Sequence, residues 1–240
     1  MELDTRTQVN SGAAFDAAPR GDMSGDVSGS VSAPQTSTPA RVAPYSEATL
    51  PTEWGVFKTR VYRGADGREQ VAIFCGDPSG DDVLARVHSA CFTGEVLGSL
   101  KCDCKPQLEG ALRRIQREGR GVVVYLFQEG RGIGLGNKLR AYALQERGAD
   151  TVDANTLLGF GEDEREYGDA VDMLRDLGAR SVRLLTNNPL KVAALEEAGV
   201  RVSSREPLVV GRNAVNAHYL DVKRDRMGHA LAGGEAGDAE

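Results

Sequence analysis

The sequence lacks several features that would place the protein in a membrane, outside the cell or on nucleic acid. No apolar run approaches the roughly 20 residues that a membrane-spanning helix needs, so we expect no membrane association. The stretch from Met1 to Asn10 lacks the charged and then apolar pattern of a secretion signal. The net charge is −6, with 29 Lys and Arg against 35 Asp and Glu. Nucleic-acid-binding proteins carry an overall basic face, so we expect no nucleic acid as a partner.

Cysteine is also scarce, and its distribution indicates metal chemistry rather than disulfide bonds. The 240 residues contain four cysteines, and three of them fall in one short stretch, Cys91-x10-Cys102-Asp103-Cys104. A chain without a secretion signal is expected in a reducing compartment, where disulfides are rare and clustered thiols bind metals or react. We therefore expect a cytoplasmic protein.

Three thiolates at this spacing suit one tetrahedral metal ion, and zinc is the first choice. Structural zinc sites usually have four protein ligands, whereas catalytic sites keep one position for water. Zinc lowers the pKa of a water molecule bound there to about 7, so an open site would be a hydrolytic centre. Two alternatives remain, namely buried structural cysteines or a closed site completed by His88 or Cys75. Cys75 ends an apolar run and is better explained as a small core residue.

Composition divides the chain into one domain and two tails. Residues 1–44 are Ser, Ala, Gly, Thr, Pro and Asp with almost no aliphatic side chains, so they cannot bury enough surface to offset the entropy of ordering. We expect a disordered tail there, with a docking peptide for a partner as the alternative. Residues 230–240, which are Gly, Ala and acidic, are expected to form a second disordered tail. Residues 45–229 are then the working domain.

Within this domain, apolar runs alternate with helical periodicity, which predicts an α/β fold. Leu108, Ala111, Leu112 and Ile115 recur at helical spacing. We expect strands over 70–76, 83–88, 122–127 and 182–185, and helices over 105–118, 137–147, 167–177 and 189–198. The two early strands are expected to be hairpin-like, which gives a layered single domain with a mixed β-sheet.

A glycine-rich turn, residues 128–138, follows the strand over 122–127 and leads into a helix. Glycines allow a phosphate to approach the backbone closely, and a helix N-terminus supplies free amide groups. Arg131 and Lys138 add positive charge. The spacing matches neither the Rossmann fingerprint nor the Walker loop. Contact with a phosphate or nucleotide is therefore one interpretation, and a flexible turn is the other.

A second anion site is indicated after the strand over 182–185. Asn188 is a good N-cap and Pro189 suits the first helical position, which places Lys191 in the first turn of a helix. The helix dipole disfavours a cation there by roughly 0.3–1 kcal/mol, and an anion lying between them would explain it. Ligands also bind at the carboxyl ends of strands in open α/β sheets. The alternative is that Lys191 simply extends into solvent.

The charged run from Gly161 to Glu166 allows two interpretations. Asp163 and Arg165 could form a base and guanidinium pair over a phosphate, or the run could be the solvated start of a helix. Composition alone does not decide between them.

A series of longer motifs runs in order through residues 53–229. They are Arg86-Val87-His88-Ser89, the cysteine stretch, Gln107-Leu108-Glu109, Gln128-Glu129-Gly130-Arg131, Asn137-Lys138-x-Arg140-Ala141-Tyr142, Asp163-Glu164-Arg165, Leu185-Thr186-Asn187-Asn188-Pro189, Val210-Gly211-Arg212-Asn213 and Asn216-x-His218-Tyr219-Leu220. Together they resemble GTP cyclohydrolase II. That family opens the guanine imidazole ring of GTP, releases formate and pyrophosphate, and leaves 2,5-diamino-6-(5-phosphoribosylamino)pyrimidin-4(3H)-one in the first step of riboflavin biosynthesis. Its members use one zinc ion, need Mg2+ with the triphosphate and are typically homodimers.

Carried over to this sequence, the resemblance implies a role for each matching residue. The implied zinc ligands are Cys91, Cys102 and Cys104. The implied GTP contacts are Arg86, Val87, His88, Ser89, Ala90, Gln107, Glu129, Gly130, Arg131, Thr151, Thr186 and Lys191. The implied catalytic residues are Asp163 as proton acceptor, Arg165 as nucleophile at the α-phosphorus and Tyr142 beside the ring-opening chemistry. Removing a proton from an arginine at pH 7 costs roughly 8 kcal/mol, so a purely electrostatic role for Arg165 stays open.

The resemblance thus implies a GTP-binding, zinc-dependent hydrolase of residues 45–229, a homodimer with one Zn2+ per chain and with Mg2+ on the triphosphate. One alternative is a cyclohydrolase paralogue that stops at the formamidopyrimidine nucleotide, although Tyr142 favours the full reaction. A second alternative, from another class, is a non-catalytic zinc-containing module that senses nucleotides. Such a module would have closed metal coordination and no need for Asp163 or Arg165.

Overall fold

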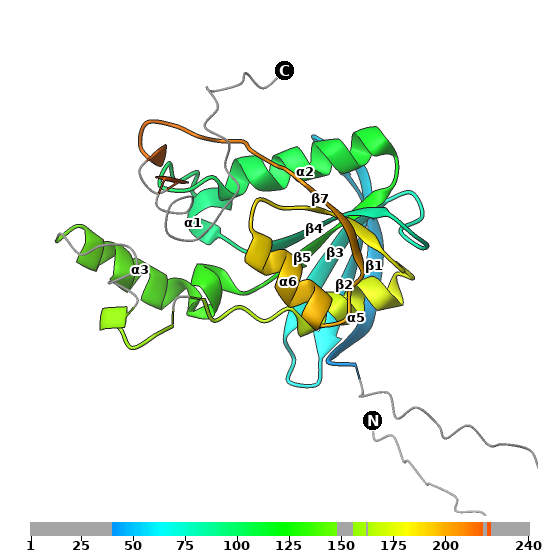
Figure 1. Cartoon of the computed structure of the whole chain (residues 1–240), viewed down its shortest axis with the longest axis horizontal. Coiled ribbons are helices and arrows are strands. Elements are labelled where there is room, and N and C mark those ends of the chain that lie inside the picture. The colour runs from blue at the N-terminus through cyan, green and yellow to red at the C-terminus, as the bar shows by residue number, and fades with distance from the viewer. Residues whose placement is uncertain (1–39, 148–155, 162, 218–219, 222–240) are drawn as a thin grey trace, which may run out of the picture. The chain divides into compact units, whose positions relative to one another are not determined.

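The computed structural model describes residues 40–147, 156–161, 163–217 and 220–221, and a seven-stranded β-sheet forms its centre (Figure 1). The strands are β1 (Val42–Thr52), β2 (Gly55–Gly64), β3 (Glu69–Cys75), β4 (Val83–Ser89), β5 (Gly121–Leu126), β6 (Val182–Leu185) and β7 (Val202–Glu206). The helices are α1 (Phe92–Glu95), α2 (Cys104–Glu118), the 3-10 turn η1 (Glu129–Gly132), α3 (Gly134–Gln145), α5 (Gly168–Asp176) and α6 (Pro189–Glu197). The α/β class expected from the sequence is confirmed.

The sheet is mixed, with the order β1-β2-β3-β5-β4-β6-β7. Strands β1, β2, β3 and β5 are successively antiparallel, whereas β5, β4, β6 and β7 are parallel. The expected hairpin between the two early strands is wrong, because β5 lies between β3 and β4. Six of the seven residues of β4 are buried, and a strand covered on both faces is typical of the parallel interior of a sheet.

Helices cover both faces of the sheet and form two separate cores. On one face, Ala111, Leu112 and Ile115 of α2 pack against Leu84 and Val123 of the sheet. On the other face, residues of α5 and α6 pack against the alternate side chains of the same strands. They belong to one cluster with Val83, Ala85, Val122 and Val124, to which the helices contribute Ala170, Val171, Met173, Leu174 and Leu195. The domain therefore has three layers, with α2 on one side and α5 and α6 on the other (Figure 1).

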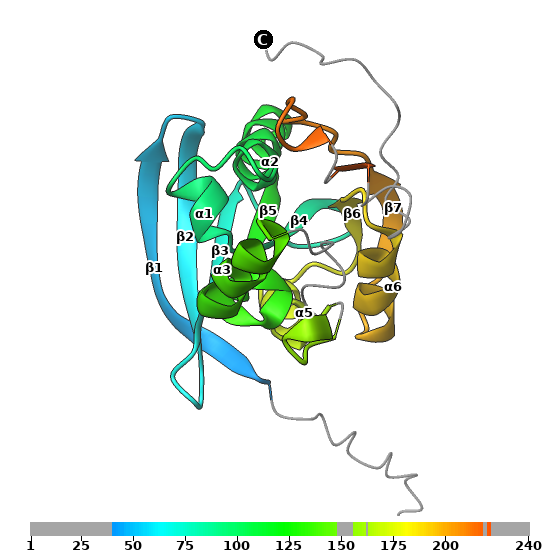
Figure 2. The same cartoon turned by 90° about the vertical axis from the view of Figure 1, so that its left-hand side faces the viewer.

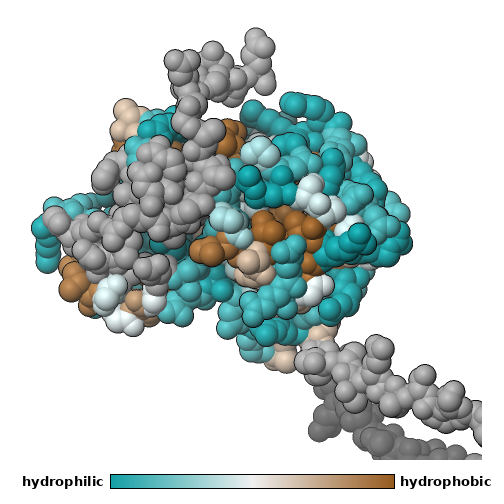
Figure 3. All heavy atoms as spheres, viewed as in Figure 1, coloured by the Kyte–Doolittle hydropathy of each residue, from teal (hydrophilic) through white to brown (hydrophobic). Residues whose placement is uncertain are grey.

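The ends of α2 and α6 follow from local residue chemistry. Gly119 ends α2 with φ of 74°, a left-handed conformation that glycine adopts without steric cost. At the start of α6, the side chain of Asn188 accepts a hydrogen bond from the Leu190 amide at 3.0 Å, and Pro189 takes the first helical position. Both features of α6 were expected from the sequence. Figure 3 shows a mostly hydrophilic face, with a hydrophobic patch in the region that α6 occupies in Figure 1.

The first strand of the sheet begins before the boundary expected at residue 44. Strand β1 begins at Val42, whose side chain is 4% exposed and belongs to the core. The preceding Arg41 amide donates to Asp172 in α5 at 2.6 Å. Composition missed this because Val42 is an isolated aliphatic residue in a polar stretch, and its partners are distant in sequence. Of the expected tail over residues 1–44, residues 1–39 lie outside the described residues, as does the whole expected tail over residues 230–240.

Among the described residues, no helix combines the length and the apolarity that crossing a membrane requires.

Two shortened chains test where the folded domain begins. A chain that starts at Ala40 should match the full chain in free energy of unfolding, to within about 0.5 kcal/mol. A chain that starts at Ser46 loses the buried Val42 side chain and should be less stable by about 1.5–3 kcal/mol. Urea unfolding followed by circular dichroism measures both. Equal stability of the two shortened chains would show that β1 does not need Val42.

Candidate functional site

The parallel strands β4, β5 and β6 end at the same edge of the sheet, and several of the expected site residues lie in these strands or directly after them. Residues 90–91 come after β4, η1 comes after β5, and residues 186–188 come after β6. The carboxyl ends of parallel strands are where open α/β sheets bind ligands. Helices α1 and α3 lie at this end and are seen together at the front in Figure 2.

The three clustered cysteines form one compact group of sulfur atoms. Their sulfurs all lie within 4.8 Å of one another, and Sγ of Cys91 is 3.7 Å from Sγ of Cys102. Two thiolates on a tetrahedral zinc with bonds of 2.3 Å would be about 3.8 Å apart. A Cβ atom on Gly94 of α1 would lie 2.8 Å from the Cys102 sulfur, so only glycine lets α1 pack this closely. The donor atoms and their spacing fit one zinc ion.

Neither residue considered as a fourth ligand joins the three cysteines. The Cys75 thiol donates to the Ile115 carbonyl at 3.4 Å and belongs to the core under α2. Nε2 of His88 lies 2.8 Å from Oε1 of Glu95, and the His88 ring stacks on Tyr125 at 5.6 Å. Within the described ranges, the group that could hold a metal ion contains the three cysteines alone. The closed-site alternative therefore loses both of its named ligands.

Close packing of the three thiols favours the thiolate form of Cys91 and disfavours the thiolate form of Cys104. Hydrogen bonds from the thiols of Cys102 and Cys104 lower the pKa of Cys91 far below its ordinary value. The same contacts, together with burial, raise the pKa of Cys104 well above it. Metal binding reverses that opposition, because a coordinated thiol is deprotonated outright. The cluster thus suits a cation better than it suits three neutral thiols.

The glycine-rich turn has a defined backbone conformation. Gly130 and Arg131 both take left-handed angles, with φ of 63° and 59°. Gly132 has φ of 94°, and a Cβ atom there would lie 2.5 Å from the carbonyl oxygen of Glu164. The Glu164 amide donates to the Arg131 carbonyl at 3.0 Å. The turn is therefore packed against residues 163–166, which argues against the flexible-turn interpretation.

Asp163 and Arg165 form the ion pair that the sequence suggested. Nε of Arg165 lies 2.7 Å from Oδ1 of Asp163, and its Nη2 donates to Oδ2, so the pair is bidentate. The Arg165 side chain is 14% exposed. Burial raises the pKa of Asp163, but the hydrogen bonds from Arg165 outweigh it and the net pKa is lowered. The run contains this ion pair, and Glu164 and Glu166 beside it are exposed shortly before α5 begins.

Gln128 joins this loop to the end of β4, a role that the sequence motif did not reveal. Its Oε1 accepts from the Glu166 amide at 3.1 Å, and its Nε2 donates to Oγ of Ser89 at 3.1 Å. The sequence does hold a signal for this role. Gln128 is a polar residue just past the end of β5, separated from it only by Phe127, and polar residues at such positions lie at the sheet edge where ligands bind. The two hydrogen bonds bring the Asp163 and Arg165 loop to the same edge as the cysteines.

Arg86 and Gln107 form a buried polar chain beneath this edge. Nη1 of Arg86 donates to the Leu185 carbonyl at 2.8 Å, and Nη2 donates to Oε1 of Gln107. Nε2 of Gln107 in turn donates to Asp103, between two of the cysteines. Burial lowers the pKa of Arg86, and its Nε finds no acceptor in the described part of the chain. The chain links the cysteine stretch to the end of β6.

Lys191 is buried and does not extend into solvent, so that alternative is wrong. Its side chain is 5% exposed, Nζ donates to the Val87 carbonyl at 2.9 Å, and Nζ lies 5.8 Å from the centre of the Tyr167 ring. Thr186, 1% exposed, accepts from the Asn188 amide at 3.1 Å. Both residues therefore lie at the shared strand edge, one beside β4 and one after β6.

Tyr142 lies in α3, and two ammonium groups lie near its ring. Its ring centre is 4.8 Å from Nζ of Lys101 and 5.8 Å from Nζ of Lys138. Lys138 also lies 3.1 Å from the Cys91 sulfur, so α3 places the tyrosine near the thiol group. Ala90 binds back to the sheet through its amide, which donates to Leu126 at 2.8 Å. Thr151 lies outside the described residues.

These features define a class of protein, an α/β domain in which three thiols that could hold a metal ion lie beside buried cations at one sheet edge. Residues 43–207 match the family model for GTP cyclohydrolase II. A Neisseria gonorrhoeae protein named GTP cyclohydrolase-2 is 54% identical over 184 residues, covering 76% of this chain and 93% of the relative. An Escherichia coli O9:H4 protein of the same name is 56% identical over 188 residues, covering 78% and 96%. The chain belongs to the GTP cyclohydrolase II family and is an enzyme of that family, as expected.

A solved structure of RibBX, a two domain 3,4-dihydroxy-2-butanone 4-phosphate synthase from A. baumannii, is 23% identical with a TM-score of 0.40, over 70% of this chain and 40% of that one. That likeness is too low to bear on the site.

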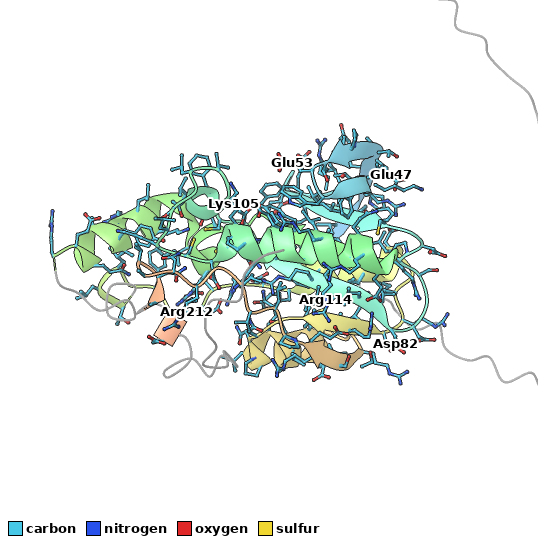
Figure 4. All side chains as sticks on the ribbon, turned by 90° about the horizontal axis from the view of Figure 1, so that it is seen from above. Glu47, Glu53, Asp82, Lys105, Arg114 and Arg212 are labelled. Carbon is cyan, nitrogen blue, oxygen red and sulfur yellow. The ribbon has the colours of Figure 1, made fainter. Side chains whose placement is uncertain are left out.

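The burial of Lys191 changes what its removal should do to stability. The dipole of α6 alone would make Lys191→Met slightly stabilising, by roughly 0.3–1 kcal/mol. Because Nζ donates to the buried Val87 carbonyl, we expect a loss of about 1–3 kcal/mol in the free energy of unfolding instead. Lys105→Met is the matched control, because Lys105 is exposed in the first turn of α2 (Figure 4). Urea unfolding should separate the two variants, and a stabilised Lys191→Met would contradict the buried hydrogen bond.

Proposed function

We propose that this enzyme is a zinc-dependent hydrolase that opens the imidazole ring of GTP, releases formate and pyrophosphate, and yields 2,5-diamino-6-(5-phosphoribosylamino)pyrimidin-4(3H)-one as the first step of riboflavin biosynthesis. Family membership supports GTP as the substrate. The observation that carries the metal requirement is the group of three sulfurs, which has no fourth ligand among the described residues.

The cysteines and Tyr142 would serve the ring chemistry. Cys91, Cys102 and Cys104 would hold one zinc ion, which when bound supplies a Lewis acid and lowers the pKa of water. The Tyr142 hydroxyl would hold or move a proton beside the opening ring. The support for this pairing is that α3 brings Tyr142 toward the cysteine group through Lys138, which contacts both.

The loop over 163–166 and the glycine-rich turn would serve the phosphate chemistry. Arg131, Arg165 and Lys191 supply positive charge for the triphosphate, and Mg2+ would accompany it, as the family resemblance implies. Arg165 would attack the α-phosphorus through a guanidinium nitrogen, break the bond to pyrophosphate and pass its proton to Asp163. Water would then break the phosphorus–nitrogen bond. The bidentate pair supports a proton path between these two residues.

The same ion pair also supports a simpler role for Arg165. The lowered pKa of Asp163 means that the carboxylate is stabilised as an anion next to a charged guanidinium. Arg165 would then only stabilise charge while water attacks the phosphorus. GTP labelled at the α-phosphorus separates the two roles. A denaturing quench during turnover leaves label on the unaltered protein if the nucleophile role holds, and none on Arg165→Ala, which has no nucleophilic side-chain atom.

The sequence also allowed two other functions. Analysis of the reaction products tests the first of them, the cyclohydrolase paralogue. A paralogue that stops at the formamidopyrimidine nucleotide would release pyrophosphate but no formate. The non-catalytic nucleotide sensor required closed coordination, for which the described residues offer no ligand, and the chain belongs to an enzyme family. We also propose a homodimer on the family resemblance alone, which light scattering of the purified protein tests.

Ring chemistry and phosphate chemistry should separate by mutation. Cys102→Ser removes a metal ligand, so we expect loss of formate release while some GTP is still cleaved to GMP and pyrophosphate. Arg165→Ala should instead stop pyrophosphate release. Chromatography of products from GTP and Mg2+, with formate and pyrophosphate assays, measures both. Metal analysis of the unaltered protein should give about one zinc per chain.

Three outcomes would contradict this scheme. Full activity without bound metal would remove the zinc requirement. Absence of pyrophosphate from Cys102→Ser would show that the two half-reactions are coupled. Pyrophosphate release at a near-normal rate by Arg165→Ala would show that Arg165 is not the group that acts at phosphorus. Cys75→Ser is the matched control for the cysteine change, because Cys75 lies in the core away from the cluster, and it should still release formate.

A further inference from the structure

Lys138 belongs to the glycine-rich turn by sequence, but its ammonium group faces the cysteine cluster. Nζ lies 3.1 Å from Sγ of Cys91, 2.9 Å from Oγ1 of Thr93 and 2.8 Å from Oε1 of Glu129. An ammonium group has three donors, and here all three are directed to protein acceptors. The side chain is only 12% exposed. The protein itself therefore fixes the position of this charge.

The acceptors around Lys138 come from elements that are also held in place. Thr93 is buried in α1, two residues after Cys91. Oε1 of Glu129 also accepts from the Gly130 amide at 3.0 Å, and its other oxygen accepts from the Phe92 amide. The Lys138 ammonium is thus the point where α1, η1 and α3 meet. Movement of any one of these elements would change its contact with the Cys91 sulfur.

The charges at this point are unbalanced without Lys138. Three thiolates outweigh the two positive charges of one zinc ion, so a filled site carries net negative charge. The Glu129 carboxylate, whose side chain is 14% exposed, adds another negative charge beside it. Unpaired charges are costly to bury. A buried cation in contact with both the sulfur and the carboxylate offsets this cost.

We propose that Lys138 is a positioning residue for the metal centre, which holds the Cys91 thiolate and withdraws electron density from its sulfur by a charged hydrogen bond. This inference rests on the proposed zinc site. A thiolate that donates less charge leaves the metal a stronger Lewis acid, and residues around the ligands set such properties in metal sites generally. Lys138 also fixes the position of the cysteine cluster with respect to Tyr142, because Tyr142 lies one turn further along the same face of α3.

Replacing zinc with cobalt allows the electron donation from the thiolate sulfurs to the metal to be followed by absorption spectroscopy. The full chain, loaded with Co2+, should show a thiolate-to-cobalt charge-transfer absorption. In Lys138→Met this band should move to longer wavelength, because loss of the hydrogen bond raises the energy of the sulfur electrons. Zinc affinity, measured by competition with a chelator, should fall about 10–100-fold. Lys105→Met removes the same charge from the exposed residue after Cys104 (Figure 4) and should change neither quantity.

Each outcome decides a stated point. An unshifted band and unchanged zinc affinity in Lys138→Met, relative to Lys105→Met, would overturn the proposed role of Lys138. If the unaltered protein takes up neither zinc nor cobalt, the proposed zinc site fails instead. If circular dichroism shows that Lys138→Met does not fold, Lys138→Gln and Lys138→Arg take its place. The band must then shift further in Lys138→Gln, which loses the charge, than in Lys138→Arg, and equal bands in both would overturn the proposal.

Discussion

The parallel pairing of β4 with β5 on one side and β6 on the other is the constraint on which the site depends. It brings three strand ends to one edge, and each end is followed by a different chemical group. The first is followed by Cys91, the second by Glu129 and the third by Thr186. Because β4 is buried on both faces, its register is strongly specified, and a slip of one residue would turn its side chains to the wrong face. The cores on both faces of the sheet therefore determine where the chemistry lies.

A second theme is the number of cations buried at this edge. Arg86, Lys138 and Lys191 are each largely buried, and each donates to a protein acceptor. Burying a charge is costly unless it is paired or hydrogen-bonded. Acceptors within the protein reduce that cost before substrate arrives, and they also fix where each charge lies. Groups held in this way stabilise an anion without having to reorganise during the reaction.

Local signals allowed part of the structure to be predicted from the sequence. The apolar run of β5, the periodicity of α2 and the cap and proline at the start of α6 each fix an element through neighbouring residues. The cysteine spacing similarly predicted the sulfur cluster. Elements that depend on distant partners were missed, as Val42 in β1 and the polar strand β7 show. The insertion of β5 between β3 and β4 was missed for the same reason, because no local pattern says which strand lies beside which.

Side-chain direction was the least predictable feature of the site. Lys138 and Lys191 were both identified as cations near anion sites, yet the sequence could not show that their ammonium groups are buried. Lys138 faces the Cys91 sulfur, and Lys191 binds the Val87 carbonyl across 104 positions of sequence. Periodicity places a residue on a helix face, but the partner on the other side of that face comes from the tertiary fold. The sequence therefore identified these two lysines as candidate site residues, but it did not predict which atoms their ammonium groups contact.

The turn η1 explains how two kinds of chemistry can share one site. On one side, Glu129 binds the Lys138 ammonium and the Phe92 amide, next to the cysteines. On the other side, two residues along, the Arg131 carbonyl accepts from the amide of Glu164, between Asp163 and Arg165. The left-handed angles of the turn let it reverse direction between these contacts. The turn therefore contacts the cysteine side through Glu129 and the loop that carries the ion pair through Arg131, which is the arrangement that the proposed reaction on one substrate requires.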